Sequence, residues 1–138
     1  MGGGGQQIST NNYMQTYKVT VNENKTICWY NKKDQLHRLD GPAVEYAEGF
    51  KEWWAEGKLH RLDGPAIEYA DGYKVWFVEG KRHRLDGPAV EYADGFKEWY
   101  VEGRRMTEED FNEYIKPKPS CEGKIVEIDG IKYKLVKA

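Results

Sequence analysis

Apolar and polar residues alternate over short stretches along most of the chain, and glycine-containing turns separate these stretches. Residues 66–69 form one such stretch, the turn Ala70-Asp71-Gly72 follows, and residues 73–78 form the next. Alternation with a period of two predicts β-strands, and glycine supplies the positive φ that tight reversals need. The pattern therefore predicts a succession of short antiparallel β-hairpins.

The hairpin pattern repeats with a fixed period. The heptapeptide His-Arg-Leu-Asp-Gly-Pro-Ala occurs at residues 37–43, 60–66 and 83–89, so that each copy begins 23 residues after the previous one. A repeat of this length indicates stacked units that bury their surfaces against their neighbours. The first unit has one additional residue in its turn, 31–35.

The charges predict how the two strands of each unit pair. If Ala70-Asp71-Gly72 is a three-residue loop, Glu68 faces Lys74, and the same register pairs the equivalent residues of the other units. A two-residue loop would instead place Glu45 opposite Glu52, and like charges in that position are unfavourable. We therefore expect the three-residue loop.

This register divides the side chains between two faces of the sheet. The predicted core face carries the aliphatic and most of the aromatic positions: Val44, Tyr46, Phe50, Trp54, Ile67, Tyr69, Tyr73, Phe77, Val90, Tyr92, Phe96 and Tyr100. The opposite face carries alanine, an ion pair and tryptophan in each unit: Ala43, Glu45, Lys51, Trp53, Ala66, Glu68, Lys74, Trp76, Ala89, Glu91, Lys97 and Trp99.

The chain as a whole is predicted to be all-β, an elongated single-layer antiparallel sheet of repeated hairpins that ends in a short helix and a further hairpin. Thr107 and Asp110 indicate the start of that helix, because threonine is a favoured N-cap and an acidic residue suits the first turn. The predicted parts are a Gly-rich leader (1–12), an N-terminal capping hairpin (13–28), the repeat array (29–105), the capping helix (106–115), a proline linker (116–120) and a C-terminal hairpin (121–138).

Composition and charge limit the classes of partner. The 21 basic and 23 acidic residues are interleaved and form no basic stripe, which argues against binding to a nucleic acid polymer. The sequence contains no apolar run long enough for a membrane span and no signal peptide at its start. Cys28 and Cys121 lack metal-ligand spacing and indicate reduced thiols, so we expect a cytoplasmic protein.

The repeated motif resembles that of a known family. The sequence Gly-Lys-x-His, then a glycine, an aromatic strand, Ala-Asp-Gly, an aromatic residue and a tryptophan is similar to the MORN repeat, a β-hairpin module. The His-Arg-Leu-Asp-Gly-Pro-Ala variant resembles repeat proteins of large phages and giant viruses. Between residues 29 and 105 this resemblance implies a protein-interaction scaffold, a dimerisation platform or a lipid-binding module. The chain departs from the usual repeat at Arg38-Leu39-Asp40-Gly41-Pro42, where the family has glycine soon after histidine.

The repeated histidines do not indicate catalysis or metal binding. Equivalent atoms of adjacent units lie about 9 to 10 Å apart, too far for a single zinc ion. No serine or cysteine nucleophile recurs near a pair such as His60 and Asp63. We therefore predict a protein that is not an enzyme and holds no cofactor. The aspartates are expected to cap turns, and Leu39, Leu62 and Leu85 are expected to close the rim of the sheet.

Two ladders of side chains are the candidate binding residues. One consists of Arg38, Arg61 and Arg84, which are expected either to hold phosphate groups or to pair with an aspartate of the next unit. The other consists of Trp53, Trp76 and Trp99, which are typical of interface anchors if they are exposed. We therefore expect a protein-interaction module, a scaffold or an inhibitor of a host protein. The alternative is a sponge for a host nucleotide signal, and homo-oligomerisation is left open.

Overall fold

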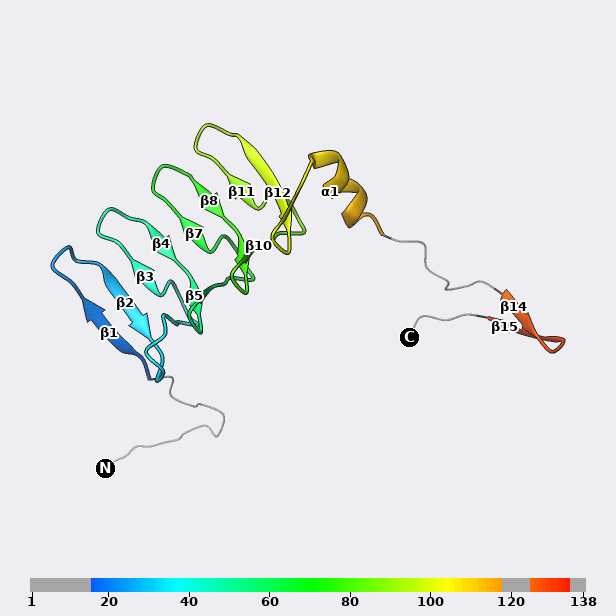
Figure 1. Ribbon diagram of the computed structural model, residues 1–138, viewed down its shortest axis with the longest axis horizontal. Coiled ribbons are helices and arrows are strands. Elements are labelled where there is room, and N and C mark those ends of the chain that lie inside the picture. The colour runs from blue at the N-terminus through cyan, green and yellow to red at the C-terminus, as the bar shows by residue number, and fades with distance from the viewer. Residues whose placement is uncertain (1–15, 118–124, 135–138) are drawn as a thin grey trace, which may run out of the picture.

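The computed structural model describes residues 16–117 and 125–134. The leader 1–12, Cys121, most of the proline linker and parts of the C-terminal segment lie outside these residues. Nine strands form one antiparallel sheet in which each hairpin lies beside the next, as Figure 1 shows, and this confirms the predicted all-β fold. In spatial order they are β1 (Lys18–Val21), β2 (Ile27–Tyr30), β3 (Val44–Glu45), β4 (Lys51–Glu52), β7 (Ile67–Glu68), β8 (Lys74–Val75), β11 (Val90–Glu91), β12 (Lys97–Val101) and β13 (Arg104–Met106).

The strand register is the one that the charges predict. Glu68 pairs with Lys74 across β7 and β8, and Glu45–Lys51 and Glu91–Lys97 are the equivalent pairs. The intervening loop has three residues, closed by hydrogen bonds between Tyr69 and Tyr73 and from Gly72 to Tyr69. Gly72 has a φ of 101°, a conformation that favours glycine. The three-residue loop is therefore confirmed.

A second set of hairpins continues from the sheet at the rim opposite the three-residue loops. These hairpins are formed by β5 (Trp54–Ala55) with β6 (Lys58–Leu59) and by β9 (Phe77–Val78) with β10 (Lys81–Arg82). Their two-residue turns have positive φ at both positions, 52° at Glu79 and 78° at Gly80, as a type I′ turn requires.

The expectation of a single strand over residues 73–78 was wrong, because this segment is divided at Trp76 into β8 and β9. The amide of Trp76 donates to the carbonyl of Ala89, and its own carbonyl accepts from the amide of His83. Residues before Trp76 thus pair within the main sheet, whereas those after it pair within the second hairpin.

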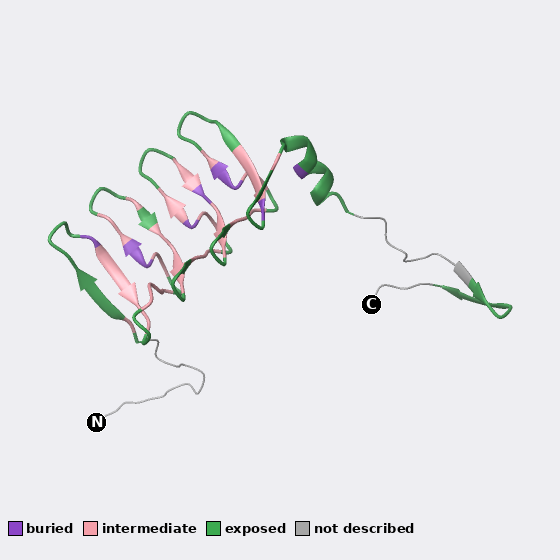
Figure 2. Ribbon diagram, in the orientation of Figure 1, coloured by how far each residue is buried: buried purple, intermediate pink, exposed green. Residues whose placement is uncertain are grey.

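Burial corrects the predicted assignment of the two faces. We call the predicted core face the aromatic face, and the opposite face the tract face, because residues 37–42, 60–65 and 83–88 cover it. Both faces contain buried positions. On the tract face Ala43, Ala66 and Ala89 have no exposed surface, and on the aromatic face Val44, Val75 and Val90 are at most 3% exposed. Figure 2 shows these buried positions as short segments inside the hairpins, with the turns exposed.

Part of the predicted core face is open to solvent. Its aromatic rings form a continuous row from Tyr46 to Phe96, with ring centroids 4.5 to 5.5 Å apart. Tyr69, Tyr92 and Phe96 are nevertheless exposed, Phe96 by 55%. Burial within this row raises the pKa of Tyr46 and of Tyr73. A single sheet has no second layer to cover such rings, so they cover the valines and remain partly solvated themselves.

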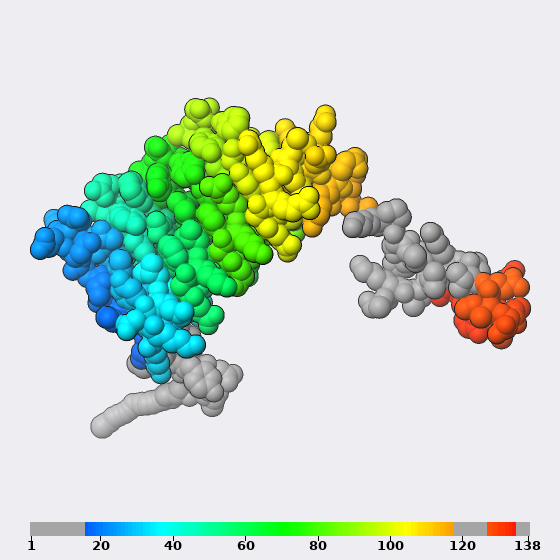
Figure 3. All heavy atoms as spheres, viewed as in Figure 1, coloured from blue at the N-terminus to red at the C-terminus, as the bar shows by residue number. Residues whose placement is uncertain are grey.

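The two ends of the array differ from its middle. At the N-terminal end the β1–β2 hairpin forms as expected. At the other end, α1 (Glu108–Ile115) begins after the N-cap Thr107, whose side chain accepts a hydrogen bond from the amide of Asp110, and it buries Phe111. The repeats between them form adjoining bands of side chains in Figure 3.

A separate hairpin pairs β14 (Ile125–Ile128) with β15 (Ile131–Lys134) around Asp129 and Gly130. Among the described helices, none has the length and apolar character of a membrane span.

Candidate binding face

The arginine of each tract is stacked on a tryptophan of the tract face. The guanidinium carbon of Arg61 lies 3.9 Å from the ring centroid of Trp53, and Arg84 lies at the same distance from Trp76. Arg38 stacks in the same way, at 3.8 Å, on Trp29. These arginines have side chains that are only 18 to 21% exposed. Each stack combines a cation–π attraction with burial of the indole face.

The same arginines are held by three further hydrogen bonds. In Arg61, Nε donates to the carboxylate of Asp63, while Nη1 donates to the carbonyl of Pro65 and to the carboxylate of Glu68. Arg38 and Arg84 make the equivalent bonds in their own tracts. The expectation that each arginine pairs with an aspartate of the next unit is wrong. The aspartate two residues further on is closer, and the short turn directs its carboxylate back to Nε.

The aspartates themselves remain largely in solvent. The side chains of Asp40, Asp63 and Asp86 are 74 to 88% exposed although each accepts a hydrogen bond from an arginine. The hydrogen bond from Arg84 lowers the pKa of Asp86 below its usual value. Because this carboxylate is so exposed, the ion pair adds little to stability, and Glu68 and its equivalents are the more buried partners.

The glycine of each tract leaves the space that the guanidinium occupies. A Cβ added to Gly64 would lie 2.8 Å from Cζ of Arg61, and the corresponding distances are 3.0 Å at Gly41 and 2.9 Å at Gly87. None of the three added carbons could occupy its position unless the arginine side chain moved. Sequence reasoning missed this role, although the fixed spacing of arginine and glycine in all three tracts was the signal that could have suggested it.

The histidine of each tract joins one unit to the next. Nδ1 of His60 accepts a hydrogen bond from the amide of Glu79, which belongs to the tight turn of the following unit. His37 and His83 accept the same bond from Glu56 and Glu102. An acceptor Nδ1 leaves the proton of the neutral ring on Nε2. Each histidine thus adds one hydrogen bond between adjacent units to those made by strand pairing.

Replacing His60 by Ala should lower the free energy of unfolding by about 1 kcal/mol, because the amide of Glu79 loses its acceptor. Amide hydrogen exchange measured by NMR would show faster exchange at Glu79. The amide of Glu102, which His83 holds, is the internal control and should exchange at its original rate. Unchanged exchange at Glu79 would contradict the bond.

The leucines of the tracts project into solvent. Leu39, Leu62 and Leu85 are 63, 80 and 50% exposed, so the expectation that they close the rim of the sheet was wrong. The neighbouring arginine and aspartate already satisfy each other within the turn, and the leucine between them points outward. Each tract is therefore a ridge on the sheet, with an apolar residue at its crest.

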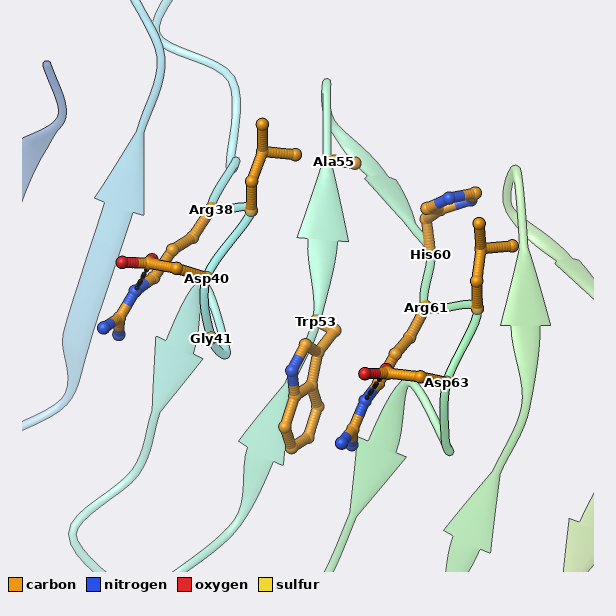
Figure 4. A pocket seen from close by; sticks show the side chains of 10 residues that line it. Arg38, Asp40, Gly41, Trp53, Ala55, His60, Arg61 and Asp63 are labelled. Atoms are coloured by element: carbon orange, nitrogen blue, oxygen red, sulfur yellow. Dashed lines mark hydrogen bonds and ion pairs between the residues drawn. The ribbon is translucent and has the colours of Figure 1, made fainter. Parts of the chain in front are cut away.

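Two equivalent grooves separate the three ridges. The first, with a volume of about 710 Å³, has Trp53 and Ala55 on its floor and the ridges of Leu39 and Leu62 at its sides. In Figure 4 Trp53 lies between Gly41 of one tract and Arg61 of the next. The second groove, of about 570 Å³, repeats this arrangement one unit further on, with Trp76 and Val78 in place of Trp53 and Ala55.

The series of grooves is limited at both ends. Tyr17 packs edge-on against Trp29, 5.4 Å between centroids, and its hydroxyl accepts a hydrogen bond from the amide of Leu39. At the far end Trp99 lines a smaller pocket beside the start of α1 and, in the described part of the chain, carries no stacked arginine. Of the predicted binding residues, Arg38, Trp53, Arg61, Trp76 and Arg84 line the two grooves, and Trp99 does not.

No family model, curated protein or solved structure matches the chain. The resemblance to MORN repeats therefore stays a prediction, and the function has to be inferred from the tract face itself.

Proposed function

We propose that this protein is a non-enzymatic interaction module that binds a protein partner across the tract face. The observation that carries the proposal is the pair of equivalent grooves, whose ridges present exposed leucines in register. Exposed apolar side chains that recur on one surface are typical of interaction sites. If the chain has the viral origin that its motif implies, the partner is a host protein and the module is a scaffold or an inhibitor.

The arginines have a supporting part in this proposal. Each guanidinium already contacts an indole, two carboxylates and a carbonyl, so it holds the groove wall in place. A ligand that took over these hydrogen bonds would have to break an existing network. The network therefore favours a partner that contacts leucine, tryptophan and backbone over one that binds the arginines directly.

A second candidate function is sequestration of a nucleotide. It is favoured by the groove volumes, which are suited to a small molecule, and by the arginine beside each indole. The purified protein would then release a compound with nucleotide absorbance on denaturation, and its affinity would fall steeply with salt. If the denatured protein releases no such compound, that result contradicts nucleotide sequestration and favours the protein partner.

Charging the crests of the ridges tests the main proposal. Lysine in place of Leu39, Leu62 and Leu85 together should leave the fold intact, because the three side chains are exposed, and should reduce partner capture about tenfold or more. The measurement is affinity capture from extracts of the source cell, quantified by mass spectrometry.

A matched control places lysine at three other exposed apolar residues, Phe96, Tyr114 and Ile115. These lie on the aromatic face and on α1, and the control adds the same charge. It should capture the partner as the unmodified protein does. Equal capture by the ridge variant would contradict binding across the tract face.

A further inference from the structure

We infer that the tract face recognises a basic segment in the polyproline II conformation, with proline at two positions three residues apart, one in each groove. This inference rests on the proposed function and names the partner's chemistry. It follows from the spacing of the grooves, from the groups that line them and from the charge of the ridges.

The spacing of the grooves selects the conformation. Adjacent grooves are separated by one repeat, which is two strands and about 9.4 to 9.8 Å across the sheet. A polyproline II segment rises about 3.1 Å per residue with three residues per turn, so residues i and i+3 are about 9.3 Å apart and face the same way.

Other regular conformations do not fit this spacing. In an extended strand residues i and i+3 are about 10 Å apart but face opposite sides, because side chains alternate. In an α-helix residues i and i+7 face the same way but lie about 10.5 Å apart, which exceeds the spacing of the grooves, and residues i and i+6, about 9 Å apart, face different ways. The threefold helix matches the groove spacing most closely in both distance and direction.

The groove lining suits proline. The floor of each groove is an indole beside a small aliphatic side chain, Ala55 in the first and Val78 in the second. Aromatic grooves are a common means of binding polyproline II ligands, which lose little conformational entropy on binding. The backbone carbonyls of such a ligand have no internal partners. His60 and His83, whose Nδ1 atoms are occupied, line the two grooves and can donate from Nε2.

The charge of the ridges favours basic residues between the prolines. Each tract network contains one arginine and two carboxylates, as Arg61, Asp63 and Glu68 show. Asp63 is 88% exposed while Arg61 is 21% exposed, so solvent meets mainly the carboxylate. Lysine or arginine at the positions that cross a ridge would lie near these aspartates.

Synthetic peptides provide the test. One contains four copies of Pro-Gln-Lys, and its control contains two copies of Pro-Gln-Pro-Lys-Gln-Lys, which has the same composition but alternating proline spacings of two and four. A third replaces each lysine of the first by glutamate. Binding to the full chain is followed by the NMR signals of the indole N–H groups, with Trp53 and Trp76 as reporters and Trp99 as the internal reference.

We expect the first peptide to shift the signals of Trp53 and Trp76 and to bind about tenfold more tightly than either control. Equal affinity for the two proline spacings, or no movement of the two signals, would overturn the inference. If no peptide binds while the lysine variant of the ridges still loses its cellular partner, the inference fails and the proposed function stands. If the first peptide binds as expected but that variant captures the partner normally, the proposed function fails.

Discussion

Replacing Trp76 by Ala is expected to lower the free energy of unfolding by about 2 to 3 kcal/mol, measured by chemical denaturation. The indole is half-buried and forms the surface on which Arg84 stacks, 3.9 Å from the ring centroid. Its removal takes away apolar burial and the cation–π contact together. The two contributions can be separated by also replacing Arg84 by Ala.

The double-mutant cycle for Trp76 and Arg84 should give a coupling energy of about 1 kcal/mol. The same cycle for Trp99 and Arg84 is the control, because no contact between these two is among the described cation–π pairs, and it should give a coupling near zero. Equal coupling in both cycles would show that the stack contributes nothing specific.

Replacing Gly64 by Ala is expected to cost about 1 to 3 kcal/mol, although alanine is usually tolerated well in a loop without positive φ. The added Cβ would lie 2.8 Å from Cζ of Arg61, which is fixed by Trp53 and by three hydrogen bonds. The arginine has to give up part of this network to make room. The measurement is again the free energy of unfolding.

The control for this prediction is the same substitution in a protein that already carries Arg61→Ala. With the guanidinium gone, the methyl group of Gly64→Ala loses its three closest neighbouring atoms and should change stability by less than about 0.5 kcal/mol. A similar cost with and without the arginine would place the origin of the effect in the backbone instead.

The strand register could be predicted from the sequence because it depends on local chemistry. Glu68 and Lys74 are six residues apart, and a glycine turn between them leaves few ways to pair. The alternation of side chains then follows from the pleat. The same reasoning placed Val44 and Val90 on one face correctly.

The candidate site could be predicted only in its residue types. The stack of Arg61 on Trp53 depends on where the tract returns over the sheet, which no local pattern specifies. Leu62 was expected to close the rim of the sheet, but it is 80% exposed, and an apolar residue is not required to be inside. The break of the strand at Trp76 arises from its hydrogen bonds to Ala89 and His83, which lie in two different segments that follow it in the chain.

The measurement that tests binding across the tract face most directly is amide hydrogen exchange, followed by mass spectrometry, on the protein alone and in complex with its captured partner. We predict slower exchange in the complex at residues 37–42, 60–65 and 83–88, with unchanged exchange at the Ala-Asp-Gly and related loops 46–50, 69–73 and 92–96. Protection of those loops with unaltered tracts would place the partner on the aromatic face and contradict the account.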